Sequence, residues 1–446
     1  MTMGIASIVF ILLVGAASWL FGRNIMRIRR NILLGKEEVI NDRKAERWSV
    51  MTRVALGQSK MVVRPVAGFL HIIVYAGFVI INIEVLEIII DGIFGTHRVL
   101  SFLGGFYDFL IGSFEWLAIG VWVACAIFLV RRNLLRLKRL VMKELDGWPK
   151  TDANLILFTE IALMTAFLLM NAADWSLQQR GAEHYTVAGA FPASAHIASL
   201  TSIASLSTGS LIAIERICWW FHIIGILAFL NYLVVSKHLH ILLAFPNVWY
   251  SKLKPRTEMA NMPRIAGEVK SMMDPSVPPP ELPAPHVVAG VEMTERFGAK
   301  DVFDLSWKSL MDAYSCTECG RCTSECPANL TGKLLSPRKI MMDTRDRVAE
   351  VGRVIDAKGK WEDDGKSLHA RISEEELWAC TTCNACTQAC PVNIDPVNII
   401  LEMRRYLVME ESRTRPALTS MFNNVENNGA PWAFGPDKRM DWTSIS

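Results

Sequence analysis

Five long apolar stretches, separated by polar and basic loops, dominate residues 1–245. Each has the roughly 20 mostly apolar residues that a helix needs to cross a lipid bilayer. The first stretch has neither the basic start nor the small-residue cleavage site of a signal peptide, so we interpret it as a retained anchor. The predicted spans are residues 4–22, 65–90, 111–130, 153–172 and 210–236.

The rest of the chain has a more polar pattern, in three parts. Residues 246–299 join a basic, aromatic stretch to a proline-rich run, which cannot be helical and is expected to be an extended spacer. Residues 300–412 are predicted to form a compact, mostly α-helical domain. Residues 413–446 are rich in Asn, Pro and Gly, and we expect them to be irregular or to lie on a partner. The predicted fold class is therefore all-α, with a five-helix transmembrane bundle before a helical domain.

Three segments of residues 300–412 carry the helical signal. Apolar residues recur at helical spacing in "DLSWKSLMDAYSC", in "SPRKIMMDTRDRVAEVGRVID" and in "PVNIILEMRRYLVMEE". The second of these begins with a Ser-Pro pair, which is typical of a helix start. No segment of this part alternates in the manner of a strand.

The basic residues predict the orientation of the bundle. Residues 23–64 contain eleven Lys and Arg and residues 131–152 contain seven, whereas residues 91–110 and 173–209 contain one each. Because basic loops stay in the cytoplasm, the N-terminus should lie outside and everything after residue 237 inside, in the inner membrane. The net charge of +3 does not by itself indicate a class of partner. We expect membrane lipid around the bundle and no nucleic-acid partner.

Eight of the ten cysteines form two runs with the same spacing, "CTECGRCTSECP" at 316–327 and "CTTCNACTQACP" at 380–391. Disulfides do not suit a cytoplasmic domain. Zinc is the alternative, but a zinc site usually takes two cysteines from each of two loops. The spacing C-x2-C-x2-C-x3-C-P instead suits two [4Fe–4S] clusters, with the fourth thiolate of each run bound to the other cluster. We assign one cluster to Cys316, Cys319, Cys322 and Cys390, and the other to Cys380, Cys383, Cys386 and Cys326.

Four histidines lie in or next to the apolar stretches. His71 belongs to the second predicted span, and His222, His238 and His240 are assigned to the fifth helix. Imidazoles on two helices can hold a b-type haem through neutral nitrogens, although each could also be a hydrogen-bonded core or interfacial residue. On one helix, His222 and His240 would lie about 27 Å apart and could serve two haems at different depths. His238 is a reserve ligand, expected to point away from His240.

Other buried polar and sulfur groups have weaker signals. Glu84, Glu87 and Glu160 fall inside predicted spans, where they could accept protons during quinol chemistry. Interfacial solvation is the alternative for the first two, and pairing with a neighbouring helix for Glu160. Cys125 and Cys218 lie alone in apolar segments and are expected to be small buried hydrophobes.

Two resemblances add to this interpretation. The double cysteine motif resembles the helical ferredoxin domain of heterodisulfide reductase, succinate dehydrogenase and anaerobic glycerol-3-phosphate dehydrogenase subunits. "FLHIIVYAGF" and "FHIIGILAFLNYLVVSKHLH" resemble the second and fifth helices of the respiratory nitrate reductase gamma-subunit family, a five-helix cytochrome b with two bis-histidine haems. This resemblance implies that His71 and His240 are the cytoplasm-side ligands and His222 an outer-side ligand. The outer partner would stand at Ile81, so His222 could bind a haem with another ligand, pair with His71, or face a quinone.

As a whole, the chain resembles the membrane-bound heterodisulfide reductase-like family. The resemblance implies a subunit of a quinone-linked oxidoreductase, with one or two b-type haems, that passes electrons between the quinone pool and a soluble redox partner. Because no cysteine follows Cys390, that partner is expected to be a separate iron–sulfur subunit with CCG domains or a flavoprotein. The alternatives are a non-catalytic redox sensor or assembly anchor with structural clusters and, more remotely, a transport component.

Overall fold

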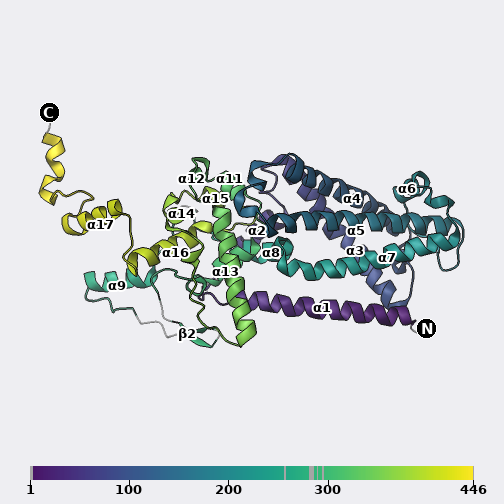
Figure 1. Ribbon diagram of the computed structural model, residues 1–446, viewed down its shortest axis with the longest axis horizontal. Helices are drawn as coiled ribbons and strands as arrows, with labels where there is room; N and C mark the ends of the chain where they lie inside the picture. The colour runs from purple at the N-terminus through teal and green to yellow at the C-terminus, as the bar shows by residue number, and fades with distance from the viewer. Residues whose placement is uncertain (1–3, 256–257, 281–285, 289, 294–295, 445–446) are drawn as a thin grey trace.

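Five apolar helices lie side by side along the long axis of the molecule (Figure 1), and we call them the transmembrane bundle. The computed structural model describes residues 4–255, 258–280, 286–288, 290–293 and 296–444. The five helices are α1 Ile5–Ile32, α3 Pro65–Phe94, α4 Gly105–Leu129, α5 Trp148–Gln179 and α7 Thr208–Tyr232. Each is long and apolar enough to cross a membrane and contains most or all of one predicted span, so the five predicted helices are confirmed.

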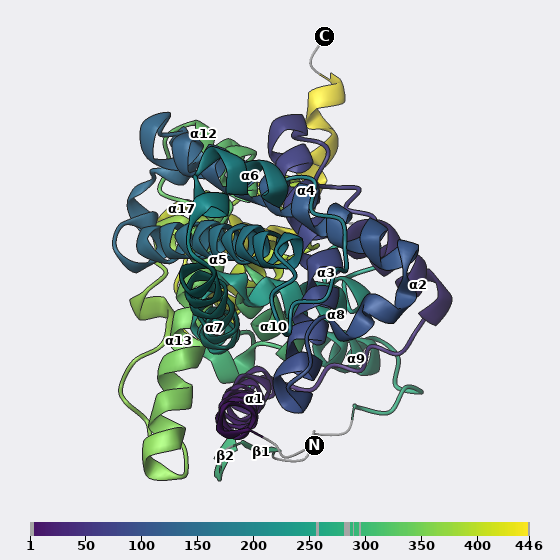
Figure 2. The ribbon, with the colours of Figure 1, turned by 90° about the vertical axis from the view of Figure 1, so that its right-hand side faces the viewer.

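The centre of the bundle is α5. It packs against both α4 and α7, α3 packs against α4, and α1 touches α3 and α7 from outside, as the end-on view in Figure 2 shows. Phe114 of α4 and Phe167 of α5 are fully buried in the core between these helices. The core also contains Cys125, which is buried, and Cys218, which is partly buried, so both pack as apolar side chains.

Shorter elements connect and flank the bundle. The α-helices are α2 Lys44–Met51, α6 Ser194–Leu200, α8 His240–Trp249 and α9 Pro263–Met273, and the strands β1 His286–Val288 and β2 Val291–Met293 form one antiparallel hairpin. Single turns of π- or 3-10 helix are η1 Thr52–Leu56, η2 Val99–Leu103, η3 Val130–Leu134, η4 Lys138–Leu140, η5 Lys143–Leu145, η6 Ile203–Ser205, η7 Leu233–Val235, η8 Lys237–Leu239, η9 Val302–Asp304 and η10 Leu368–Ala370. Part of the proline-rich spacer, residues 281–285, lies outside the described residues.

A second group of helices gathers at one end of the bundle, and we call it the cysteine domain. It consists of α10 Trp307–Ser315, α11 Arg321–Ser324, α12 Pro327–Leu330, α13 Pro337–Lys358, α14 Glu374–Ala379, α15 Ala385–Ala389 and α16 Pro396–Met409. The predicted helices correspond to α10, α13 and α16. Ser336 caps α13 by accepting a hydrogen bond from the Lys339 amide, which is the capping expected of the Ser-Pro start. The domain is therefore helical, as predicted.

The C-terminal end of α1 is part of the core of the cysteine domain. Asn31 donates a hydrogen bond to the Tyr314 hydroxyl (3.1 Å), and Arg30 forms an ion pair with Asp356 (2.5 Å). Gly352 of α13 lies against Asn31, and a Cβ at this position would overlap the Asn31 side chain. The two parts of the chain therefore share one interface. We call the end of the bundle at this interface the near end, and the opposite end the far end.

Two predictions about local structure are wrong. The fifth helix does not continue through the last two histidines, because the backbone becomes extended at Ser236 (φ −110°, ψ 151°). Asp152 at the start of α5 stabilises this break, since it accepts hydrogen bonds from the Ser236 hydroxyl (2.7 Å) and the Lys237 amide (3.0 Å). The tail is not wholly irregular either, because it contains α17 Pro416–Asn428 and the 3-10 helix η11 Pro436–Ser444.

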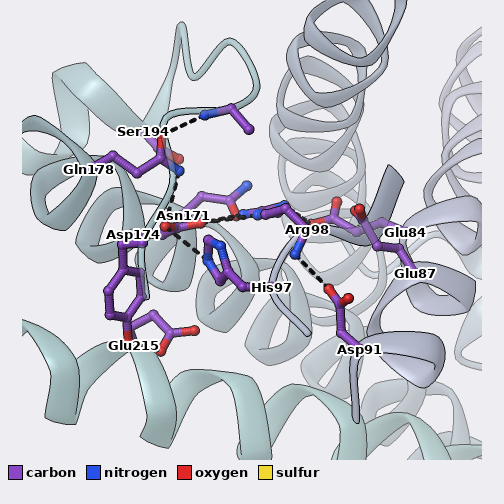
Figure 3. A network of polar contacts seen from close by, with 12 residues as sticks. Glu84, Glu87, Asp91, His97, Arg98, Asn171, Asp174, Gln178, Ser194 and Glu215 are labelled. Carbon is purple, nitrogen blue, oxygen red and sulfur yellow. Dashed lines mark hydrogen bonds and ion pairs between the residues drawn. The ribbon is translucent and has the colours of Figure 1, made fainter. Parts of the chain in front are cut away.

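A buried polar network joins the helices at the far end (Figure 3). Its centre is Arg98, whose guanidinium binds Glu84 of α3 (3.0 Å), Asp174 of α5 (2.9 Å) and the Asn171 side-chain oxygen (2.7 Å). Glu87 accepts a hydrogen bond from the Leu100 amide (2.9 Å). Glu84 and Glu87 therefore hold the far-end loop in place. Both are only 2% exposed, so interfacial solvation does not describe them, and proton acceptance stays a prediction.

We predict that Arg98→Gln destabilises the bundle by about 3–5 kcal/mol, because it leaves the carboxylates of Glu84 and Asp174 buried without their cation. Thermal unfolding of the purified protein in detergent measures the effect. Arg180→Gln is the matched control, since Arg180 is an exposed arginine at the same end and should change the unfolding midpoint little. Equal midpoints for the two variants would contradict the role of the network.

Candidate functional site

The two cysteine loops, residues 316–326 and 380–390, have the same backbone conformation. The third residue of each loop, Glu318 or Thr382, has φ of 55°. The fifth, Gly320 or Asn384, is also left-handed, with φ of 72° and 59°. In the second loop this turn directs the Thr382 amide to the Cys380 sulfur at 3.4 Å. Because the two loops share this turn, each can hold the same kind of inorganic group, with backbone amides close to its sulfur ligands.

The four cysteines of each loop are divided between two cavities. The first cavity contains the first three cysteines of the first loop and the last cysteine of the second: Cys316, Cys319, Cys322 and Cys390. The second cavity contains the remaining cysteine of the first loop with those of the second: Cys326, Cys380 and Cys383. Cys386 lines both cavities. The crossed arrangement expected from the sequence is therefore sterically available.

Burial keeps these thiols neutral unless a metal is bound. Burial raises the pKa of Cys316 to about 12, of Cys386 to about 12 and of Cys390 to about 11. Thiolates are the ligand form, so a bound metal must supply the charge that stabilises them. Small cavities lined by cysteine sulfur, without His, Asp or Glu among the described residues that line them, match iron–sulfur clusters.

Basic side chains from the loops of the bundle hold the backbone of the first cavity. Arg139 donates a hydrogen bond to the Cys319 carbonyl (2.6 Å), and Lys60 donates one to the Cys390 carbonyl (2.9 Å). Sequence reasoning counted both cations as evidence of orientation and missed these contacts. Nothing in the local sequence distinguishes them from the other basic residues of the two loops.

A buried ion-pair chain also crosses the interface. Glu318, in the first cysteine loop, binds Lys237 at the near end of the bundle and Arg345 of α13 (2.8 Å). Burial alone would raise the pKa of Glu318, but the charges of Lys237 and Arg345 outweigh burial and hold that pKa below its ordinary value. The glutamate is therefore ionised at neutral pH and fixes the first cysteine loop against the bundle.

The four histidines line one cavity of about 470 Å³ between the helices at the near end and in the middle of the bundle. The ring centroids of His71 and His240 are 6.5 Å apart. The break after the fifth helix also brings His238 to 5.4 Å from His240. The expectation that these two point apart on one helix is therefore wrong. His222 lies apart from the other three and packs against Phe167.

The hydrogen bonds of the histidine rings show which ring nitrogens are available to bind a metal. Nδ1 of His240 lies 3.2 Å from the Lys237 carbonyl, and Nδ1 of His222 lies 3.0 Å from the Leu163 carbonyl. A carbonyl only accepts, so both Nδ1 atoms carry a hydrogen and both Nε2 atoms keep a lone pair. Nδ1 of His71 is buried and has no hydrogen-bond partner among the described residues. These nitrogens have the state that a metal ligand requires.

The residues at the near end fit a b-type haem. Two imidazoles on opposite sides of one metal ion, each at about 2 Å, have centroids roughly 6 Å apart, and His71 and His240 meet this condition. The π-turn η3, a feature frequent at functional sites, brings Arg131 and Arg132 to the same cavity. The buried Nε of Arg132 has no partner among the described residues, as suits an anionic group such as a haem propionate.

The histidine cavity and the first cysteine cavity share a wall. Cys319 lines both, as do Arg321 and Pro391. A group in one cavity is therefore separated from a group in the other by little more than one side chain.

Of the remaining candidates, Ile81 and Glu160 both line the histidine cavity, and the Glu160 carboxyl makes no hydrogen bond or ion pair with any residue that the structure describes. Pairing of Glu160 with a neighbouring helix is therefore not found.

Comparison with known proteins agrees with the sulfur chemistry. Residues 315–394 match the family described as "4Fe-4S dicluster domain". The chain is 27% identical to "Probable iron-sulfur-binding oxidoreductase FadF" of Bacillus subtilis, over 98% of this chain and 60% of that protein. It is 27% identical to "EtfAB:quinone oxidoreductase" of Syntrophomonas wolfei, over 92% and 56%. A third relative, "Probable membrane-anchored ferredoxin" of Chromohalobacter salexigens, is 30% identical over 33% of this chain and 24% of that protein.

These comparisons define a class. The first relative is named an iron–sulfur-binding oxidoreductase and the second a quinone oxidoreductase. This chain combines a 4Fe-4S dicluster domain with five helices of membrane-spanning length and composition. It is thus a protein with a 4Fe-4S dicluster domain and a bundle of candidate membrane-spanning helices. The chain spans somewhat more than half of the length of the first two relatives. No solved structure matches the chain significantly.

We predict that Glu318→Gln weakens the junction between the cysteine domain and the bundle by about 3–5 kcal/mol, because Lys237 and Arg345 lose their buried counter-charge. Limited proteolysis and thermal unfolding of the anaerobically purified protein measure this loss. Glu325→Gln is the control: Glu325 also bridges the interface, to Arg64, but is half exposed and should contribute about 0–1 kcal/mol. A larger effect at Glu325 would refute this ranking.

Proposed function

We propose that the chain is a membrane-anchored electron-transfer subunit that connects the quinone pool with a soluble redox partner through one b-type haem and two [4Fe–4S] clusters. The observation that carries this proposal is that Cys319 lines both the histidine cavity and the first cysteine cavity. Two redox groups in adjoining cavities have a use in electron transfer that separate structural sites would not have. The comparison with a quinone oxidoreductase supports the quinone as the lipid-side substrate.

In this proposal, the chain holds its cofactors with two kinds of ligand. His71 and His240 bind the haem iron, His238 remains a reserve ligand beside His240, and His222 is assigned another role. One cluster takes Cys316, Cys319, Cys322 and Cys390, and the other takes Cys380, Cys383, Cys386 and Cys326. When bound, these groups supply one-electron redox chemistry, while the protein fixes their order and adjusts their potentials. Lys60 and Arg139, whose charges lie next to the first cluster, favour its reduced, more negative form.

The proposed orientation has the near end and the cysteine domain in the cytoplasm. Both strongly basic loops lie at the near end, where Lys60 and Arg139 contact the cysteine loops. A loop excess of Lys and Arg marks the cytoplasmic side. The far end, which includes the N-terminus of α1, then faces outward across the inner membrane.

The soluble partner is proposed to meet the second cluster. Cys383 is exposed, whereas Cys326, Cys386 and Cys390 are buried, so the second cavity approaches the surface of the cysteine domain. A [4Fe–4S] or flavin group on a partner could approach closest there. The partner is an iron–sulfur or flavin protein, and its substrate defines the overall reaction.

His71→Ala tests the haem directly. We expect the variant to lose the b-type haem absorbance and to keep the broad iron–sulfur absorbance, because only the histidine cavity loses a ligand. Optical spectra of the purified protein, before and after addition of a quinol analogue, provide the measurement. His196→Ala, at an exposed histidine of α6, should keep both signals. A wild-type protein without haem, or loss of both signals in His71→Ala, would refute the proposal.

A second test concerns the crossed cluster ligands. Both Cys390→Ala and Cys326→Ala should lower the non-haem iron from about eight to about four atoms per chain. After treatment with a thiol reagent, mass spectrometry should find modified Cys316, Cys319 and Cys322 in Cys390→Ala, and modified Cys380, Cys383 and Cys386 in Cys326→Ala. The opposite pattern would mean that each loop holds its own cluster. Zinc in place of iron would exclude the clusters altogether.

A further inference from the structure

The histidine cavity extends beyond His71 and His240 into the middle of the bundle. Phe78 of α3, Glu160 of α5 and His222 of α7 line this extension, which we call the mid-membrane lobe. Phe78 and Glu160 lie 13 and 12 residues from the helix starts at Pro65 and Trp148, hence roughly 18–20 Å from the near end. The hydrocarbon core of a bilayer is about 30 Å thick. The lobe is therefore well within the membrane.

The lobe contains two polar groups whose hydrogen-bonding capacity is unused. The carboxyl group of Glu160 has no hydrogen bond or ion pair with any described residue. The Nδ1 hydrogen of His222 is committed to the Leu163 carbonyl (3.0 Å), so its Nε2 is an acceptor. Because Leu163 is three residues after Glu160, this hydrogen bond holds His222 about one helical turn beyond the carboxyl group. A carboxyl group without a partner and a free acceptor nitrogen inside a membrane are costly unless a ligand binds them.

The access route indicates the nature of that ligand. Phe78 and its neighbour Val79 line the cavity and are 44% and 54% exposed on the outside of the bundle, at the depth of the lipid chains. A molecule that enters here must be soluble in lipid, and it must carry two hydrogen-bond donors on a small head. The aromatic and aliphatic side chains around the lobe suit a flat ring.

We propose that the mid-membrane lobe is the binding site of the quinol headgroup, with one hydroxyl donating to Nε2 of His222 and the other to the carboxylate of Glu160; this inference rests on the function proposed above. Oxidation of one quinol breaks its two O–H bonds and releases two protons and two electrons. The protons pass to His222 and Glu160. A haem held by His71 and His240, in the adjoining part of the cavity, would supply the one-electron acceptor for the two electrons.

This assignment explains why the sequence has Ile81 where a second haem would need a histidine. Ile81 lines the same cavity and is buried, and it offers no ligand to a metal. His222 is thus free to bind a quinol hydroxyl, which is one of the three roles that the sequence left open for it.

Binding of a fluorescent hydroxyquinoline N-oxide, a quinol analogue whose emission is quenched on binding, tests the site in the full-length protein in nanodiscs. Glu160→Gln and His222→Leu should each bind the analogue about tenfold more weakly than wild type, the usual effect of losing a hydrogen bond to a charged or buried group. Both should keep the haem absorbance in full. Glu183→Gln and His196→Leu, at exposed positions of the far end, are the controls and should bind as wild type.

The outcomes separate the site from the function on which it rests. Unchanged binding in both lobe variants would overturn the site, and so would loss of haem absorbance in His222→Leu, because His222 would then be an iron ligand. Glu160→Gln preserves shape and so decides the question where His222→Leu does not fold. A wild-type protein that lacks haem but binds the analogue through Glu160 would refute the electron path and leave the quinol site in place.

Discussion

The structure depends on one interface, at which the bundle holds the main chain of both cysteine loops. Arg139 and Lys60 reach carbonyls of Cys319 and Cys390, and the buried Glu318 bridges to Lys237. Hydrogen bonds from charged groups to backbone carbonyls are stronger than neutral ones, and these two are partly buried. If the cysteine loops moved relative to the membrane helices, Arg139, Lys60 and Lys237 would lose these partners. That rigidity keeps the two cavities adjoining.

The break after the fifth helix is the second condition for this arrangement. If α7 continued, His240 would lie about 27 Å from His222 along one axis and outside the cavity that His71 lines. Asp152 instead accepts hydrogen bonds from Ser236 and Lys237 and turns the chain across the end of the bundle. The same turn presents Lys237 to Glu318. Asp152 thus positions both His240, which lines the histidine cavity, and Lys237, which binds Glu318 of the first cysteine loop.

Sequence patterns correctly predicted the elements that depend only on residues close together in the chain. Membrane spans follow from length and hydropathy, and α13 follows from apolar spacing and the Ser336 cap. The helix break could not be predicted, since "YLVVSKHLH" contains neither glycine nor proline and the break depends on the distant Asp152. Likewise, Arg98 was visible only as one of two cations on its side, and its role as the centre of a polar network depends on residues of α3 and α5. Tertiary contacts decide both cases.

The polarity of the bundle changes with depth in a way that suits a path for electrons rather than for ions. At the far end, Arg98 forms ion pairs with both Glu84 and Asp174 and holds these carboxyl groups in place. In the middle, the Glu160 carboxyl and Nε2 of His222 line the same cavity as Phe78, which is 44% exposed. At the near end, positive charge surrounds the place where the proposed haem and first cluster meet, which favours the arrival of electrons. Protons and electrons from one lipid-soluble donor would therefore separate at the mid-membrane lobe, with the electrons continuing toward exposed Cys383.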